Sequence, residues 1–168
     1  MTPAALAAPD AARQRALLDE RARLLARPAA VEHRGAKLSL VTFEIGAEHY
    51  GIESHRVWGV FRLNDLAPLP GAEPSVAGLT SWRGDLLAVL DLRVLLGLPA
   101  AGLDDRAWVV CIGDTRPVLG LLAGAMQDLV TVPADEIRGP RTRDPRPLVR
   151  GVTRDAVLVV DVEILLKA

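Results

Sequence analysis

Residues 76–97 read VAGLTSWRGDLLAVLDLRVLLG and contain clear strand and turn signals. An Arg83-Gly84-Asp85 corner separates two apolar runs, and Asp91 follows the second run just before a short leucine-rich segment. Apolar runs bounded by turn residues in this way predict two short strands. Asp91 is well placed to cap one helical turn, because its side-chain oxygens can accept hydrogen bonds from free backbone N–H groups.

A second copy of this pattern lies about 70 residues later in the chain. The segment AVLDLRVLL matches LVVDVEILL, which places Asp91 opposite Asp161. Upstream of it, VAGLT matches VRGVT, which places Gly78 opposite Gly151. Each copy therefore ends in a strand, an aspartate and one helical turn, as expected of two related units.

The repeat extends further upstream, where residues 43–60, FEIGAEHYGIESHRVWGV, can be laid on residues 110–129, VCIGDTRPVLGLLAGAMQDL. This alignment pairs Ile45-Gly46 with Ile112-Gly113, Gly51 with Gly120, Val57 with Met126, and Val60 with Leu129. Across the whole repeat, the paired glycines and aspartates are 67, 69, 73 and 70 residues apart, in the same order. We interpret these glycines as turn residues or as sites where strands approach closely, and not as phosphate-binding loops.

The chain is predicted to be mainly β, with two small β-barrel units related by internal duplication, because short strands at this turn density are typical of barrels. The expected organisation is an N-terminal extension over 1–34, which contains a helix over 10–27, and a domain over 35–168. The first unit spans roughly 38–100 and the second roughly 105–168, and strands can be exchanged between them. The helix either packs on the domain edge or docks on a partner or a second copy.

Composition narrows the classes of function. The chain has 168 residues, half of them hydrophobic, which is enough for a real core. With 20 basic and 21 acidic residues it lacks the basic excess that nucleic-acid binders usually carry. The single cysteine, Cys111, lies in an apolar run and is expected to be packed inside, which fits a reducing cytoplasm. Neither a secretory signal nor a membrane-spanning run is expected.

The residues do not form a recognisable catalytic, metal or cofactor motif. His33, His49 and His55 lack a companion cluster of cysteines or carboxylates at metal-ligand spacing. Ser81 lacks the Gly-x-Ser-x-Gly elbow of a nucleophile. The basic loop RGPRTRDPRP, residues 138–147, has no aromatic residue for base stacking, so we expect a flexible, solvated loop. We therefore predict a protein that is not an enzyme, has no cofactor, and works through its surface.

The ordered run of motifs resembles the CheW family, the coupling proteins of bacterial chemosensory arrays. The motifs are FEIGAEHYGI…VWGV, P…VAGL…RGDLLAVLDLRVLLGL, LGLLAGAMQDLVTVP and RGVTRDAVLVVDVEILL, and together they cover about residues 38–167. The resemblance implies a fold of two similar five-stranded SH3-like barrels packed around a shared core. That fold agrees with the repeat found in the sequence.

The same resemblance implies the work of a non-catalytic adaptor. CheW-like proteins bind the regulatory domain of a CheA-type histidine kinase at the barrel ends, and the cytoplasmic tip of methyl-accepting chemoreceptors in the groove between the barrels. The expected location is therefore the cytoplasm, with recruitment to membrane-bound receptor arrays. Neither nucleic acid nor direct membrane insertion is expected.

The protein-binding residues that the resemblance implies are centred on Arg83, the arginine of the family's Asn-Leu-Arg-Gly motif, which reads SWRG here. Gly84 supplies the turn, and Trp82, Val57 and Gly59 complete the set. The alternative is a structural arginine, whose stem packs on a tryptophan, Trp82 or Trp58, while its head pairs locally.

The chain departs from the family pattern at Ser81-Trp82, at Gly59, where an acidic residue is typical, and at Ala123-Gly124. These departures motivate a second hypothesis, a divergent paralogue that competes for or caps array positions. A related possibility is a chemosensory-like system for pili or gliding. A third hypothesis, from another class, is a small β-barrel enzyme or nucleic-acid binder.

Overall fold

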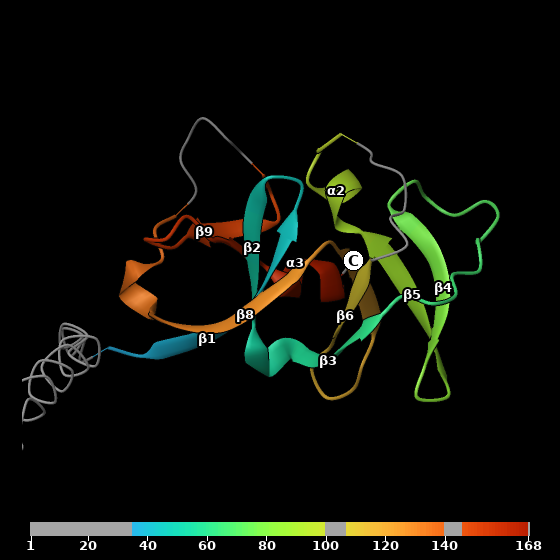
Figure 1. Cartoon of the computed structure of the whole chain (residues 1–168), viewed down its shortest axis with the longest axis horizontal. Helices are drawn as coiled ribbons and strands as arrows, with labels where there is room; N and C mark the ends of the chain where they lie inside the picture. The colour runs from blue at the N-terminus through green and yellow to red at the C-terminus, as the bar shows by residue number, and fades with distance from the viewer. Residues whose placement is uncertain (1–34, 100–106, 140–145, 168) are drawn as a thin grey trace, which may run out of the picture. The chain divides into compact units, whose positions relative to one another are not determined.

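The computed structural model describes residues 35–99, 107–139 and 146–167 (Figure 1). The helix expected over 10–27 lies outside these residues. The described elements, in chain order, are β1 (Lys37–Ile45), β2 (Glu48–Glu53), the 3₁₀ turn η1 (Ser54–Arg56), β3 (Val57–Arg62), β4 (Val76–Trp82), β5 (Asp85–Asp91), α2 (Leu92–Leu95), β6 (Trp108–Ile112), β7 (Leu119–Ala123), β8 (Met126–Pro133), the 3₁₀ turn η2 (Ala134–Glu136), β9 (Val149–Val152), β10 (Leu158–Val160) and α3 (Val162–Lys167).

The strands form two five-stranded sheets, called sheet A and sheet B here (Figure 1). Sheet A has the order β8-β1-β2-β10-β9, and sheet B has the order β3-β6-β7-β5-β4. Each sheet therefore takes strands from both halves of the sequence. One parallel pair in each sheet, β2 with β10 or β5 with β7, connects antiparallel pairs. The predicted mainly β class, with two five-stranded units, is confirmed.

The internal duplication is visible in the order and the register of the strands. Exchanging β1–β5 with β6–β10 converts the strand order of sheet A into that of sheet B. Gly51 lies opposite Val159 in sheet A, and Gly120 lies opposite Val89 in sheet B. Both valines are two residues before a cap aspartate, so the register of the parallel pairs is the same in the two sheets.

One pair of the sequence alignment is wrong. Phe43 lies opposite Tyr50 just before Gly51, and Ile112 lies opposite Leu119 just before Gly120, so the structural counterpart of Ile112 is Phe43. Ile45, which the sequence alignment pairs with Ile112, lies two residues after that counterpart. The sheet A hairpin continues its ladder to Ile45, whereas the sheet B hairpin leaves its ladder at Ile112, and the shared Ile-Gly dipeptide conceals this difference.

The two cap aspartates act as the sequence predicts. The Asp91 carboxylate accepts a hydrogen bond from the backbone N–H of Arg93 at 2.9 Å, at the start of α2. The Asp161 carboxylate accepts one from the backbone N–H of Glu163 at 3.1 Å, at the start of α3. Each carboxylate satisfies one of the backbone donors that a helix start leaves free.

The two sheets share one core. Its fully buried side chains come from sheet A (Phe43, Tyr50, Ile52), from sheet B (Val110, Ile112, Leu121) and from α2 (Leu92). Burying one large apolar side chain contributes about 1.5–3 kcal/mol, so this shared layer holds the sheets together. Cys111 is buried as predicted, and burial raises the pKa of its thiol to about 11, so the thiol stays protonated at neutral pH.

Candidate docking surface

The tip of the β4–β5 hairpin carries three of the residues that the sequence singles out. Trp82 pairs with Asp85, and the two residues between them, Arg83 and Gly84, have φ values of 52° and 93°. Positive φ at both central residues is what a type I′ hairpin turn requires. Gly84 adopts this conformation without strain, whereas Arg83 is held in it by the hairpin. The guanidinium of Arg83 is thus presented from a defined backbone position.

The Trp82 ring organises the side chains around this turn. The guanidinium carbon of Arg83 lies 4.6 Å from the ring centroid, a cation–π contact. Phe61 of β3 stacks on the same ring, with 6.4 Å between the ring centroids. A Cβ atom at Gly59 would lie 2.9 Å from Cζ2 of Trp82, so only glycine leaves room for the ring. Trp82 and Gly59 are therefore a matched pair.

The structure brings together Trp82, Arg83 and Gly59, with Gly84 as the turn residue. Val57 has a different place, because it begins β3 and packs against the shared core. Phe61 belongs to the cluster, although the sequence did not single it out. Phe61 and Gly59 are two residues apart on one strand, so their side-chain positions share one face of the sheet. This spacing could have identified Phe61 from the sequence.

A hollow of about 320 Å³ opens beside Trp82 on sheet B. It lies between the β4–β5 hairpin and the loop that joins β6 to β7. Its lining is Trp82, Asp85, Leu86, Leu87, Arg116, Pro117 and Val118. Leu86 is 78% exposed and Val118 is 46% exposed, so the hollow has apolar side chains at its mouth. We call this feature the sheet B hollow.

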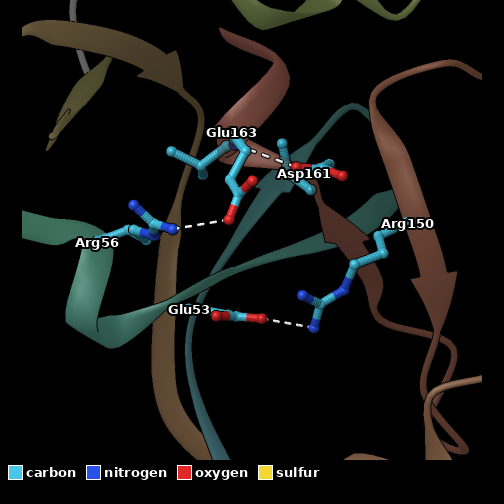
Figure 2. A pocket seen from close by; sticks show the side chains of 7 residues that line it. Glu53, Arg56, Arg150, Asp161 and Glu163 are labelled. Atoms are coloured by element: carbon cyan, nitrogen blue, oxygen red, sulfur yellow. Dashed lines mark hydrogen bonds and ion pairs between the residues drawn. The ribbon is translucent and has the colours of Figure 1, made fainter. Parts of the chain in front are cut away.

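A second pocket, of about 230 Å³, lies on sheet A and is lined mainly by charged side chains (Figure 2). Glu53 and Arg150 point toward one another with 2.5 Å between charged atoms, and Arg56 and Glu163 do so with 2.9 Å. Arg56 also pairs with Asp114. In this pocket both guanidinium groups already have a carboxylate partner within the protein.

A second charged cluster, around Arg146, corrects the expectation for the basic loop. Arg146, expected to be solvated, is only 17% exposed and donates hydrogen bonds to both carboxylate oxygens of Glu48, at 2.7 and 2.9 Å. It also donates to the Tyr50 hydroxyl at 2.7 Å, and that hydroxyl donates to Glu48 at 2.7 Å. The Arg146 hydrogen bonds hold the pKa of Glu48 below its usual range, while burial raises the pKa of Tyr50.

The two pockets differ in what they can bind. The sheet A pocket consists of ion pairs, which fix side chains in place. The sheet B hollow can receive an apolar side chain, with one anion and one cation in its lining. Among residues 35–99, 107–139 and 146–167, no group of three or more His, Cys, Asp or Glu could hold a metal ion. Within the same ranges, none of the helices has the length and apolar character needed to cross a membrane.

Comparison with known proteins gives consistent matches over the part of the chain that contains both sheets. Residues 39–168 match the family model of the CheW-like domain. The chain is 24% identical to the chemotaxis protein CheW of Klebsiella aerogenes over 96 residues, which span 57% of this chain and 58% of that protein. It is 28% identical to a probable chemotaxis protein CheW of Rhizobium etli over 122 residues, 73% of this chain and 77% of that protein.

A solved structure gives the same result for the fold. The scaffolding protein TtCheW from Thermoanaerobacter tengcongensis matches with a TM-score of 0.67 at 20% identity, over 79% of this chain and 90% of that one. The match to the Klebsiella aerogenes protein covers less than two thirds of that relative's length. The family model, in contrast, extends from β1 to the C-terminal end of the chain, through both sheets. The chain therefore belongs to the CheW-like domain family.

Proposed function

We propose that this chain is a non-catalytic adaptor that couples methyl-accepting chemoreceptors to a CheA-type histidine kinase in a chemosensory array. The observation that carries the proposal is the family match over residues 39–168, which spans both sheets of the duplicated fold. Support also comes from the contrast between the two pockets. The charged pocket is closed by internal ion pairs, whereas the sheet B hollow has exposed apolar residues that a partner could cover.

In this proposal the domain over 35–168 supplies the docking faces. The regulatory domain of the kinase docks on a barrel end, and the receptor tip docks in the groove between the barrels. The cytoplasmic adaptor is held at the membrane by its partners, and needs no cofactor. The contact residues are Arg83, Gly84, Trp82 and Gly59, at and behind the hairpin tip, together with Val57 at the start of β3.

The Arg83 guanidinium is suited to such a contact. It is exposed and lies over the Trp82 ring, which limits its freedom before a partner arrives. Ordering long side chains is one of the costs of association, so a guanidinium that is already stacked loses less entropy on binding. Tryptophan and arginine are also among the residues that most often dominate binding energy at interfaces.

The test is direct binding by titration calorimetry. The full chain is titrated with the regulatory domain of a CheA-type kinase from the same organism, and separately with a soluble fragment of a chemoreceptor that contains its cytoplasmic tip. We expect binding to at least one partner at micromolar concentration, and a clear loss of affinity for Arg83→Ala. The matched control is Arg154→Ala, which changes an exposed arginine between β9 and β10 of sheet A. Absence of heat with both partners at high micromolar concentration would remove the proposal.

A second candidate has one observation in its favour, the Trp82 and Gly59 pair. A ring held over a glycine gives the hairpin tip a shape that a carboxylate at position 59 would not give. Such a chain could occupy an array position without transmitting the receptor signal. Kinase activity measured with receptor, kinase and this chain together distinguishes the two functions: an adaptor restores receptor control of the kinase, whereas a capping paralogue binds and lowers it.

A further inference from the structure

Each sheet ends on one side in a strand that has a single neighbour among the described residues. Sheet B ends at β3, which pairs with β6, and sheet A ends at the equivalent strand β8, which pairs with β1. The other ends of the two sheets, β4 and β9, are each covered by an isolated bridge, from Ala67 and Arg138 respectively. In the part of the chain that the structure describes, β3 and β8 are therefore the strands with an unpaired edge.

The unpaired edge of β3 carries free backbone groups. The N–H of Leu63 donates to the carbonyl of Ala107 at 3.0 Å, so the backbone of Leu63 faces β6. Residues of an antiparallel pair face their neighbour alternately, so the backbones of Val60 and Arg62 face away from β6. Within the described ranges, the N–H groups of these two residues have no hydrogen-bond partner. They therefore offer donors and acceptors to another strand.

The equivalent edge of β8 is blocked. Ala134 donates its N–H to the residue before β1, so Leu129, Thr131 and Pro133 face away from β1 by the same alternation. Pro133 has no N–H, and the N–H of Leu129 donates to the Asp128 carboxylate at 2.9 Å. Natural proteins protect exposed edges with prolines and charged side chains of this kind. The β3 sequence, VWGVFR, contains neither a proline nor a carboxylate, so its edge lacks this protection.

The β3 edge is complementary to itself. Two copies of one antiparallel edge can pair about a two-fold axis, because each outward residue offers one N–H donor and one C=O acceptor. With the axis at Val60, the two copies of Val60 exchange hydrogen bonds, and Arg62 lies beside Trp58 of the partner subunit. An axis at Arg62 would instead bring two cations together, which is unfavourable. The register is therefore set by the side chains.

The side chains favour a second copy as the occupant. The chain already stacks Arg62 on Trp108 and Arg83 on Trp82, with 4.8 and 4.6 Å between guanidinium carbon and ring centroid. Trp58 is 41% exposed, so its ring is accessible to a further arginine. The symmetric pair forms this contact twice, and it also places one β-branched valine against another, a favourable pair across two strands.

We propose that two copies of this chain associate through β3, by antiparallel pairing about a two-fold axis at Val60 that joins their two copies of sheet B into one continuous sheet. This inference goes beyond the adaptor function, which makes no statement about self-association. The pairing has few backbone hydrogen bonds, so we expect a reversible dimer in the micromolar to millimolar range of concentration.

The experiment is sedimentation velocity of the full chain over a range of concentrations, with no other protein present. Arg62→Pro removes an outward N–H, at an edge position where proline leaves the pairing with β6 intact. Arg62→Ala removes the same side chain but keeps the N–H, so the two variants separate backbone pairing from stacking. Thr131→Pro makes the equivalent change on the edge of β8 and is the matched control. Urea unfolding identifies any variant that has lost its native fold.

We expect Arg62→Pro to weaken dimer formation about tenfold, because the two-fold axis makes each lost hydrogen bond count twice. Arg62→Ala should weaken it clearly less, and Thr131→Pro should leave it unchanged. Amide hydrogen exchange of the native chain gives a second measurement that needs no variant. Exchange at Val60 and Arg62 should slow as the concentration rises, whereas exchange at Thr131 should stay constant.

Three results would overturn the proposal. The first is a native chain that stays monomeric at millimolar concentration. The second is a dimer that Arg62→Pro weakens no more than Thr131→Pro does, which would place the interface elsewhere. The third is exchange at Val60 and Arg62 that does not change with concentration. None of these results bears on binding to the kinase or the receptor, so the adaptor function is tested separately.

Discussion

Sheets A and B have the same strand order but neutralise their arginines in different ways. On and beside sheet A, the guanidinium groups of Arg146 and of Arg150 in β9 each meet a carboxylate, and so does that of Arg56 in the η1 turn that leaves β2. In sheet B, Arg83 lies 4.6 Å from the centroid of the Trp82 ring, and Arg62 lies similarly, 4.8 Å from a Trp108 ring. A carboxylate neutralises the positive charge of an arginine, whereas an aromatic ring carries no net charge and leaves the arginine able to pair with a carboxylate of a partner.

The difference lies at equivalent positions of the duplicated chain. Glu163 donates its backbone N–H to Asp161 as Arg93 does to Asp91, yet the two side chains have opposite charges. The residues that define backbone geometry, such as the cap aspartates, are the same in both copies, and the surface residues have diverged. Around sheet A the arginines form ion pairs within the protein, whereas in sheet B Arg83 and Arg62 stack on tryptophan rings.

The largest expected effect concerns the partly buried ion pair between Arg146 and Glu48, whose side chains are 17% and 37% exposed. Arg146→Met should lower the free energy of unfolding by about 2 kcal/mol, because it removes charge-assisted hydrogen bonds to Glu48 and to the buried Tyr50 hydroxyl. Arg150→Met is the comparison, because the pair of Arg150 (44% exposed) with Glu53 (15% exposed) does not include the Tyr50 hydroxyl. Its loss should be smaller, about 1 kcal/mol or less. Urea unfolding measures both. Equal, small losses would mean that the hydrogen bonds of Arg146 to Glu48 and Tyr50 contribute no more than the Arg150–Glu53 pair does.

The same ion pair predicts a dependence of stability on pH. Arg146 holds the pKa of Glu48 below its usual value in the folded protein, so the folded state favours the ionised carboxylate. This contribution is fully present above the pKa of Glu48 in the unfolded chain, about 4.3, and is lost as the pH falls through the lower folded value. The stability of Arg146→Met should therefore fall less steeply with pH below about 4.3 than that of the native chain.

Alanine substitutions at two equivalent glycines, Gly51 in sheet A and Gly120 in sheet B, measure how tightly each sheet is packed. A Cβ atom at Gly120 would lie 2.5 Å from Cγ1 of the fully buried Val109, and one at Gly51 would lie 3.1 Å from Cγ1 of the half-buried Val157. Gly120→Ala should therefore cost about 1–3 kcal/mol by overpacking, and Gly51→Ala less than about 1 kcal/mol. Urea midpoints give the comparison. A larger loss for Gly51→Ala would mean that sheet A is the more tightly packed.

Much of this fold could be predicted from the sequence because its backbone signals are local. Asp91 and Asp161 precede apolar turns and cap them, and Gly84 marks a hairpin. Signals of this kind act over a few residues, so they remain legible in a single chain. The internal repeat also predicted the order of the strands, because strand boundaries recognised in one copy apply to the other.

The errors and omissions have long-range or geometric causes. The sequence places Arg146 in solvent because its partner Glu48 is 98 residues away, and no local pattern connects them. It pairs Ile45 with Ile112 because a shared dipeptide conceals hairpins of different geometry. The packing of Trp82 over Gly59 depends on how β3 and the β4–β5 hairpin, which lie at opposite ends of the strand order of sheet B, come together, so residue spacing alone could not show it. Its role in docking stays a prediction.

The Trp82 and Gly59 pair should show thermodynamic coupling. Gly59→Ala alone should cost about 1 kcal/mol, because its methyl group forces the ring away from Phe61 and Arg83. In a Trp82→Leu background the same change should cost almost nothing, since the space is then open. A double-mutant cycle from urea unfolding should give a coupling energy of about 0.5–3 kcal/mol, as for residues in contact. If the losses of unfolding free energy in the two single variants add up to the loss in the double variant, Trp82 and Gly59 are not energetically coupled.

The smallest effect tests whether the duplication extends to energetics. Asp91→Ala and Asp161→Ala should each lower the free energy of unfolding by about 1 kcal/mol, because each carboxylate satisfies one free N–H at a helix start. Asparagine keeps the accepting oxygen, so Asp91→Asn and Asp161→Asn should remain within about 0.5 kcal/mol of the native chain. If only one of the two aspartates stabilises the protein, the two copies of the repeat differ in their helix caps as well as in their surface side chains. Equal losses in the alanine pair would instead confine the divergence to side chains that face outward, such as those around the sheet B hollow.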